Sequence, residues 1–138
     1  PPKAIIVDYL QRYDPQQEKG ETRDIAIGRM TMALKDLAVS HKIPVILLAQ
    51  LGRDVEKENR IPRLSDLRES GNIEQDADRV VFIHAPDEKE DGGTQDLTDQ
   101  SLQRIEVNIV QAKGRSDGVA SLTMSFHCPT TTFWPITR

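Results

Sequence analysis

Ala4-Ile5-Ile6-Val7-Asp8 and Val45-Ile46-Leu47-Leu48-Ala49-Gln50 are the two runs that decide the fold. Each is a short, continuous apolar run closed by a polar residue, and β-branched residues recur in both, which is typical of buried parallel strands. Between them, from about Thr22 until Pro44, apolar side chains recur at helical spacing. That face comprises Ala26, Met30, Ala33, Leu34, Leu37 and His41. A strand, a helix and a strand in this order predict a right-handed βαβ crossover in a parallel sheet.

Beyond residue 50 the sequence predicts three more strands. Residues 79–83 form another apolar run, which we expect to be a third core strand beside the first two. Alternating apolar residues then mark two half-exposed strands around Val107 and Met124, separated by a turn at Ser116-Asp117-Gly118. The predicted fold class is therefore α/β: parallel strands with a crossover helix, followed by an antiparallel hairpin extension.

Two polar stretches separate these elements. Residues 51–71 predict a long exposed connection, in which Ser65 and Asn72 are candidate helix N-caps. Residues 85–101 contain six acids against one base around Gly92-Gly93, within a chain of net charge -4. This composition predicts a solvated acidic loop, and a partner-binding acidic patch is the alternative.

Length and composition restrict the class of protein. At 138 residues, with 37% apolar and 29% charged residues, the chain fits one globular domain and excludes collagen-like or coiled-coil architectures. It contains neither an apolar run long enough to span a membrane nor a signal peptide, so we expect a cytoplasmic location. The lone Cys128 cannot form an intrachain disulfide. Because the chain opens at Pro1 without an initiator methionine, we expect it to be part of a longer protein.

Two polar residues close the two predicted parallel strands. Asp8 follows the first strand and Gln50 ends the second, so both should lie at the carboxyl edge of the sheet, where open α/β folds bind ligands. An acid there can hold Mg²⁺ through water, and an uncharged amide can hydrogen-bond a terminal phosphate. The alternative interpretation is that both residues simply end their strands.

A cationic pair stands near the predicted hairpin turn. Lys113 and Arg115 are two residues apart at a strand end, so both side chains should leave one face. They are candidates for a phosphate clamp or arginine finger, or alternatively for solvent-exposed positions. The three histidines show no metal-ligand spacing. No Gly-x-x-x-x-Gly-Lys-Ser/Thr loop occurs in the chain, so a nucleotide hydrolase would need its P-loop upstream.

Residues 65–78 carry the most specific signal in the sequence. They read Ser65-Asp66-Leu67-Arg68-Glu69-Ser70-Gly71-Asn72-Ile73-Glu74-Gln75-Asp76-Ala77-Asp78 and closely resemble the signature of DnaB-type hexameric replicative DNA helicases. In the family's order, residues 5–11 resemble its Walker B strand, residues 44–53 its sensor strand, and Lys113-Gly114-Arg115 its Lys-x-Arg finger. The resemblance covers nearly the whole chain, and the acidic loop is its least similar part.

This resemblance implies a fold and a nucleotide site. Residues 1–138 would be the carboxyl-terminal part of a RecA-like motor domain, a partial P-loop NTPase core whose P-loop and catalytic glutamate lie upstream. ATP and Mg²⁺ would be the cofactors, with Asp8 serving Mg²⁺ and Gln50 sensing the γ-phosphate. Lys113 and Arg115 would reach the nucleotide of a neighbouring subunit. Asp117, an acid where the family has an Asn-Gly-Pro-like turn, is expected to weaken the positive field of Arg115.

The resemblance also implies partners. Arg68, Glu69 and Gly71 would contact single-stranded DNA through its backbone, without base readout. The full-length protein would be a homo-oligomer, a hexameric ring, that uses ATP to translocate on single-stranded DNA and unwind duplex DNA, with primase and a helicase loader as partners. The fragment alone is predicted to be inactive. A RecA-type recombination ATPase and a non-catalytic assembly module derived from a helicase are the alternatives.

Overall fold

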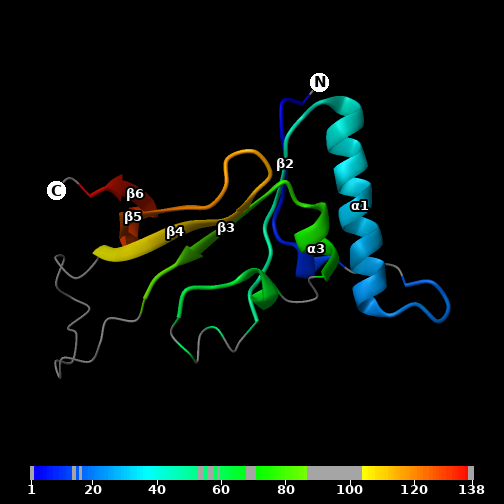
Figure 1. The fold of residues 1–138 in the computed structure, drawn as a ribbon, viewed down its shortest axis with the longest axis horizontal. Coiled ribbons are helices and arrows are strands. Elements are labelled where there is room, and N and C mark those ends of the chain that lie inside the picture. The colour runs from blue at the N-terminus through cyan, green and yellow to red at the C-terminus, as the bar shows by residue number, and fades with distance from the viewer. Residues whose placement is uncertain are drawn as a thin grey trace. The chain divides into compact units, whose positions relative to one another are not determined.

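The computed structural model describes residues 2–13, 15, 17–52, 55, 58, 60–67, 71–86 and 104–136 (Figure 1). The chain divides into two compact units. Unit 1 comprises residues 1–57 and 63–78, and unit 2 comprises residues 58–62 and 79–138. Most of the predicted acidic loop 85–101 lies outside the described residues.

Unit 1 contains the predicted parallel pair and its crossover helix. Strands β1 (Ile5–Val7) and β2 (Val45–Leu47) pair in parallel, with Ile5 opposite Val45 and Val7 opposite Leu47. Helix α1 (Arg23–His41) connects them and is drawn beside them in Figure 1. The expectation of parallel strands joined by a crossover helix is confirmed.

Helix α1 begins and ends where the sequence indicates, but its buried residues match the predicted apolar face only in part. The Thr22 hydroxyl accepts a hydrogen bond from the Ile25 N–H at 3.5 Å, and Lys42 ends the helix with a φ of 54°. Of the predicted apolar face, Ala26 is buried, whereas Ala33 and His41 are exposed. The other fully buried residues of α1 are Ile27, Gly28 and Thr31.

The connection after β2 folds back on itself. Leu51 forms an antiparallel bridge with Leu67, and the Gly52 N–H donates to the Asp66 carbonyl at 2.9 Å. The 3-10 turn η2 (Leu64–Asp66) directly precedes Leu67. At its start, the Arg63 N–H donates a hydrogen bond to the Asp66 carboxylate at 2.6 Å. The predicted cap Ser65 is inside this turn, so that assignment is wrong.

Unit 2 is a four-stranded antiparallel sheet. Its strands follow the order β3-β4-β5-β6, with the 3-10 turn η4 (Cys128–Thr130) before the last one. They are β3 (Arg79–His84), β4 (Arg104–Gly114), β5 (Ala120–His127) and β6 (Thr132–Pro135). The β4–β5 hairpin was predicted, whereas β6 was not.

Strand β3 does not continue the parallel part of the fold as predicted, because it pairs antiparallel with β4. A continuous apolar run predicts a strand but not the direction of its partner. In β3, Val80 and Phe82 are buried, while Val81 and Ile83 on the other face are exposed. Val107 of β4 is also buried, and the rings of Phe126 and Phe133 contact each other with centroids 4.7 Å apart.

In the part of the chain that the structure describes, no helix has the length and apolar character to cross a membrane.

Candidate functional site

The carboxyl ends of β1 and β2 bring Asp8 and Gln50 to the same sheet edge. The backbone pairing continues past the strands: the Leu48 N–H donates to the Val7 carbonyl at 3.0 Å, and the Leu10 N–H donates to the Leu48 carbonyl at 2.8 Å. Asp8 directly follows β1, and both its side chain and that of Gln50 are exposed. Both residues therefore follow the carboxyl ends of the parallel pair, and the approach of their side chains to one another stays a prediction.

A third polar residue at this edge was not singled out from the sequence. The Gln11 side-chain oxygen accepts from the Gln50 N–H at 3.0 Å, and its Nε2 donates to the Gln50 carbonyl at 3.4 Å. Gln11 belongs to the 3-10 turn η1 (Leu10–Arg12), which is anchored by Leu10 with only 1% of its surface exposed. The periodicity of the sequence contains no signal for this contact, because it joins residues 39 positions apart.

Asp8 offers chemistry that suits a hard cation. Its carboxylate is exposed at the edge, and the described residues contain no group of three or more metal-ligating side chains that could enclose an ion. A magnesium ion keeps several of its waters and needs only one or two protein carboxylates. A single accessible carboxylate therefore fits Mg²⁺ better than it fits a structural metal such as zinc, which requires a closed set of ligands.

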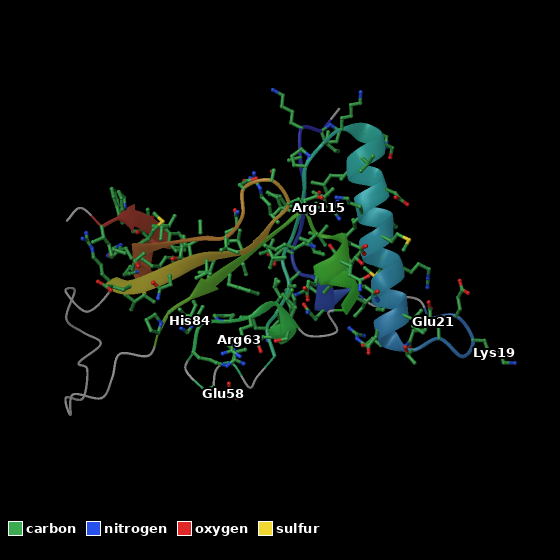
Figure 2. The ribbon with its side chains drawn as sticks, in the orientation of Figure 1. Lys19, Glu21, Glu58, Arg63, His84 and Arg115 are labelled. Atoms are coloured by element: carbon green, nitrogen blue, oxygen red, sulfur yellow. The ribbon has the colours of Figure 1, made fainter. Side chains whose placement is uncertain are left out.

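Lys113 and Arg115 belong to unit 2. Figure 2 labels Arg115 at the turn of the β4–β5 hairpin. Lys113 is in β4, opposite Val80, whereas Arg115 lies in the turn just after the strand. The prediction that strand alternation sends both side chains from one face therefore does not apply to Arg115.

Two glycines shape the turn that carries Arg115. A Cβ on Gly114 would lie 2.7 Å from the Gly118 carbonyl oxygen, and Gly118 has a φ of +72°. The Gln111 side chain also donates to that carbonyl, at 2.9 Å. These contacts fix the backbone on both sides of Arg115.

Asp117, which was expected to weaken the field of Arg115, forms an ion pair with Arg79 at the start of β3. Its charge is therefore partly compensated within the sheet, which reduces the expected effect on Arg115.

The predicted DNA-contacting residues are only partly described. Arg68 and Glu69 lie outside the described residues, and Gly71 is the first residue of helix α3 (Gly71–Asp76). The predicted cap Asn72 is inside α3 instead. Its side chain lies against Gly28 of α1, where an added Cβ would come within 2.2 Å of the Asn72 Nδ2.

Further polar contacts hold α3 and the residue Asp78 after it against α1. The buried Thr31 hydroxyl lies 2.6 Å from an Asp76 carboxylate oxygen, and Lys35 forms an ion pair with Asp78. The segment that immediately follows Arg68 and Glu69 in the chain is thus fixed to the long helix.

Comparison with known proteins places these features in a family context. The family model described as "DnaB-like helicase C terminal domain" matches residues 2–134. The probable plasmid replicative DNA helicase of Chlamydia psittaci is 38% identical over 131 residues, which cover 94% of this chain and 26% of the relative. The replicative DNA helicase DnaB of Geobacillus stearothermophilus is 35% identical over 123 residues, which cover 88% and 25%. The chain thus spans about a quarter of the length of these curated relatives.

The chain is also similar to solved structures of helicase and ATPase domains. One of them, the structure of an ATPase domain, superimposes with a TM-score of 0.78 at 32% identity, covering 97% of this chain and 44% of that one. A DnaB-like replicative helicase, solved in a study of its interactions with primase, gives a TM-score of 0.78 at 31% identity, covering 97% and 30%.

Proposed function

Because the chain belongs to the DnaB-like helicase C-terminal domain family, we propose that it forms the carboxyl-terminal part of a RecA-like motor in an ATP-dependent replicative DNA helicase. The observation that carries the proposal is the shared sheet edge at which Asp8 and Gln50 lie, because α/β nucleotide hydrolases bind their ligand at such an edge. In this proposal the full-length protein translocates on single-stranded DNA and unwinds duplex DNA in the cytoplasm.

Asp8 and Gln50 have separate roles in ATP hydrolysis. Asp8 would hold Mg²⁺, which would supply positive charge to offset the charge that develops on the phosphates. Gln50 donates a hydrogen bond from its side-chain amide toward the terminal phosphate. Because its carboxamide carries no charge, Gln50 senses that phosphate by geometry rather than by net attraction.

Lys113 and Arg115 act on the ATP bound by a neighbouring subunit. Their positive charges stabilise the transferring phosphoryl group in the transition state, as a finger supplied in trans does. This role requires a homo-oligomeric ring, for which we propose a hexamer. The hairpin glycines Gly114 and Gly118 support the role because they fix the turn from which Arg115 extends.

Arg68, Glu69 and Gly71 form the DNA-contacting segment of the proposed ring. Arg68 supplies a charge for a backbone phosphate, and Gly71 brings main-chain N–H groups close to the strand. The packing of α3 against α1 supports the proposal, because it fixes the carboxyl side of this segment. Primase and a loader are proposed as further partners, the former because one similar helicase was solved in a study of its interactions with primase.

Steady-state ATPase measurements on the full-length protein test the nucleotide site. Asp8→Ala and Gln50→Ala should each lower kcat by about tenfold or more, since each removes a group that faces the reacting phosphates. Gln17→Ala is the matched control, because its side chain donates to the Glu21 carbonyl, at 3.4 Å, elsewhere in unit 1. Wild-type turnover in both site variants would refute the assignment and favour a non-catalytic assembly module.

A further inference from the structure

The pairing of β1 with β2 is continued by a side chain where the backbone of β1 turns away. After Val7 the chain enters η1, yet the backbone of Gln50 still finds one donor and one acceptor there. Both belong to Gln11, whose Oε1 lies 3.0 Å from the Gln50 nitrogen and whose Nε2 lies 3.4 Å from the Gln50 oxygen. A primary amide carries the same donor and acceptor as a peptide group, so it can replace one rung of the ladder.

Gln11 is itself held in place. The neighbouring Leu10 is almost fully buried, and its N–H donates to the Leu48 carbonyl. The η1 turn is closed by the Arg12 N–H donating to Tyr9 and the Tyr13 N–H donating to Leu10. The Gln11 carboxamide therefore starts from a fixed backbone, and its two bonds restrain the main chain of Gln50.

We infer that Gln11 is a positioning residue that fixes Gln50 relative to Asp8 at the nucleotide edge. This inference rests on the proposed function, because it assigns Gln11 a role only through the side chain of Gln50. The bonds engage the main chain of residue 50, so they leave the Gln50 carboxamide available for phosphate. Gln11 does not touch the nucleotide, and its effect is confined to where the Gln50 amide stands.

Positional precision has a known influence on rate. A misplacement of about 1 Å can lower a rate by up to about 100-fold when the group acts in the transition state. When the two Gln11 hydrogen bonds are lost, the end of the strand pair is still held by the hydrogen bond from the Leu10 N–H to the Leu48 carbonyl, so we expect a smaller effect. The expected loss in kcat for Gln11→Ala is about tenfold, with the KM for ATP changed less than about twofold.

A double-mutant cycle in the full-length protein provides the test. Gln50→Ala keeps the main-chain N–H and carbonyl that Gln11 binds but removes the amide that Gln11 is inferred to aim. Gln11→Ala should therefore lower kcat about tenfold in the wild-type background and less than about twofold in the Gln50→Ala background. Gln11→Met, which keeps the length but not the hydrogen bonds, should behave like Gln11→Ala.

The possible outcomes separate this inference from the proposed function. Equal losses from Gln11→Ala in both backgrounds, with a matching loss of thermal stability, would show a merely structural residue and overturn the inference alone. An effect of Gln50→Ala without any effect of Gln11→Ala would do the same. If Gln50→Ala itself leaves kcat unchanged, both the inference and the nucleotide role of Gln50 fail. Gln17→Ala should match the wild type throughout.

Discussion

The parallel pair β1–β2 and the antiparallel sheet β3–β6 present their candidate catalytic residues in different ways. Asp8 directly follows β1 and Gln50 lies three residues after β2, and these two strands are distant in sequence. The Gln11 side-chain amide continues the pairing at the main chain of Gln50. Arg115 stands in a turn between two consecutive strands, where nearby glycines define the backbone. The first arrangement depends on long-range contacts and the second on local conformation, so they should fail under different substitutions.

The largest effect should come from the local arrangement. Arg115→Ala is expected to lower the ATPase rate of the assembled full-length protein about 10³-fold or more, because the side chain stabilises charge that develops only in the transition state. Nucleotide binding to an isolated subunit should remain nearly unchanged. Arg104→Ala, at the exposed start of β4, is the matched control. Wild-type turnover by Arg115→Ala oligomers would remove Arg115 from the catalytic site.

The long-range arrangement should be most sensitive at Leu10. Leu10→Ala is expected to lower the free energy of unfolding by about 2–5 kcal/mol, because it leaves a cavity beneath the turn that carries Gln11. Leu10→Met conserves volume and should cost less than about 1.5 kcal/mol. Chemical denaturation followed by circular dichroism measures both values. Equal stability of Leu10→Ala and wild type would show that η1 does not anchor the edge.

Gly28→Ala sharpens the comparison within unit 1. In an unhindered helix this change stabilises a protein by about 0.5–1 kcal/mol. Here the new Cβ would lie 2.2 Å from the Asn72 side chain, so we expect the free energy of unfolding to fall by about 1–3 kcal/mol. Chemical denaturation measures this change. Adding Asn72→Ala should remove most of that penalty. A stabilising Gly28→Ala would mean that α3 does not pack on α1 as described.

The segment proposed to contact DNA allows Arg68 to be compared with Arg104, an arginine outside it. Arg68→Ala should weaken single-stranded DNA binding similarly for all sequences and make the dependence of log K on log salt shallower by about 0.7, as loss of one phosphate contact does. Fluorescence anisotropy over a salt series measures both quantities, with Arg104→Ala again as the control. A sequence-selective loss would contradict backbone contact.

The smallest effect concerns Glu21, before α1 (Figure 2). A hydrogen bond from Arg29, with 3.0 Å between Nη2 and Oε2, and a second from the Glu18 N–H lower the pKa of the Glu21 carboxyl. A lowered pKa stabilises the folded state above the unfolded pKa, and this contribution is lost as the pH falls through the folded value. Glu21→Gln should therefore slightly lower Tm at pH 7 but not at pH 3, relative to the exposed Glu106→Gln. A Tm difference between Glu21→Gln and the wild type that grows toward pH 3 would contradict a lowered pKa of Glu21.

Patterns of single elements were predictable from the sequence, and contacts between elements were not. The runs that became β1 and β2, the span of α1 and the β4–β5 hairpin follow from periodicity. Gln11 was missed because its partner is distant in sequence, and Asn72 was misassigned because its packing depends on Gly28.

Strand β3 was placed in the wrong sheet because an apolar run does not reveal whether its partner runs parallel or antiparallel. Periodicity also placed Arg115 on the strand, while the two glycines of the hairpin place it in the turn.

The spacing of paired residues along the chain also has a kinetic consequence. In the β4–β5 hairpin Gln111 pairs with Ala120, whereas in unit 1 Ile5 can meet Val45 only after the whole α1 segment has been brought back. Hairpins form in about 1–10 μs, and closing a longer loop adds an entropic barrier. During refolding, pulse-labelled hydrogen exchange should accordingly protect amides of β5 before those of β2. The residues proposed to face the nucleotide would then be assembled late, after the strands flanking Arg115 have already paired.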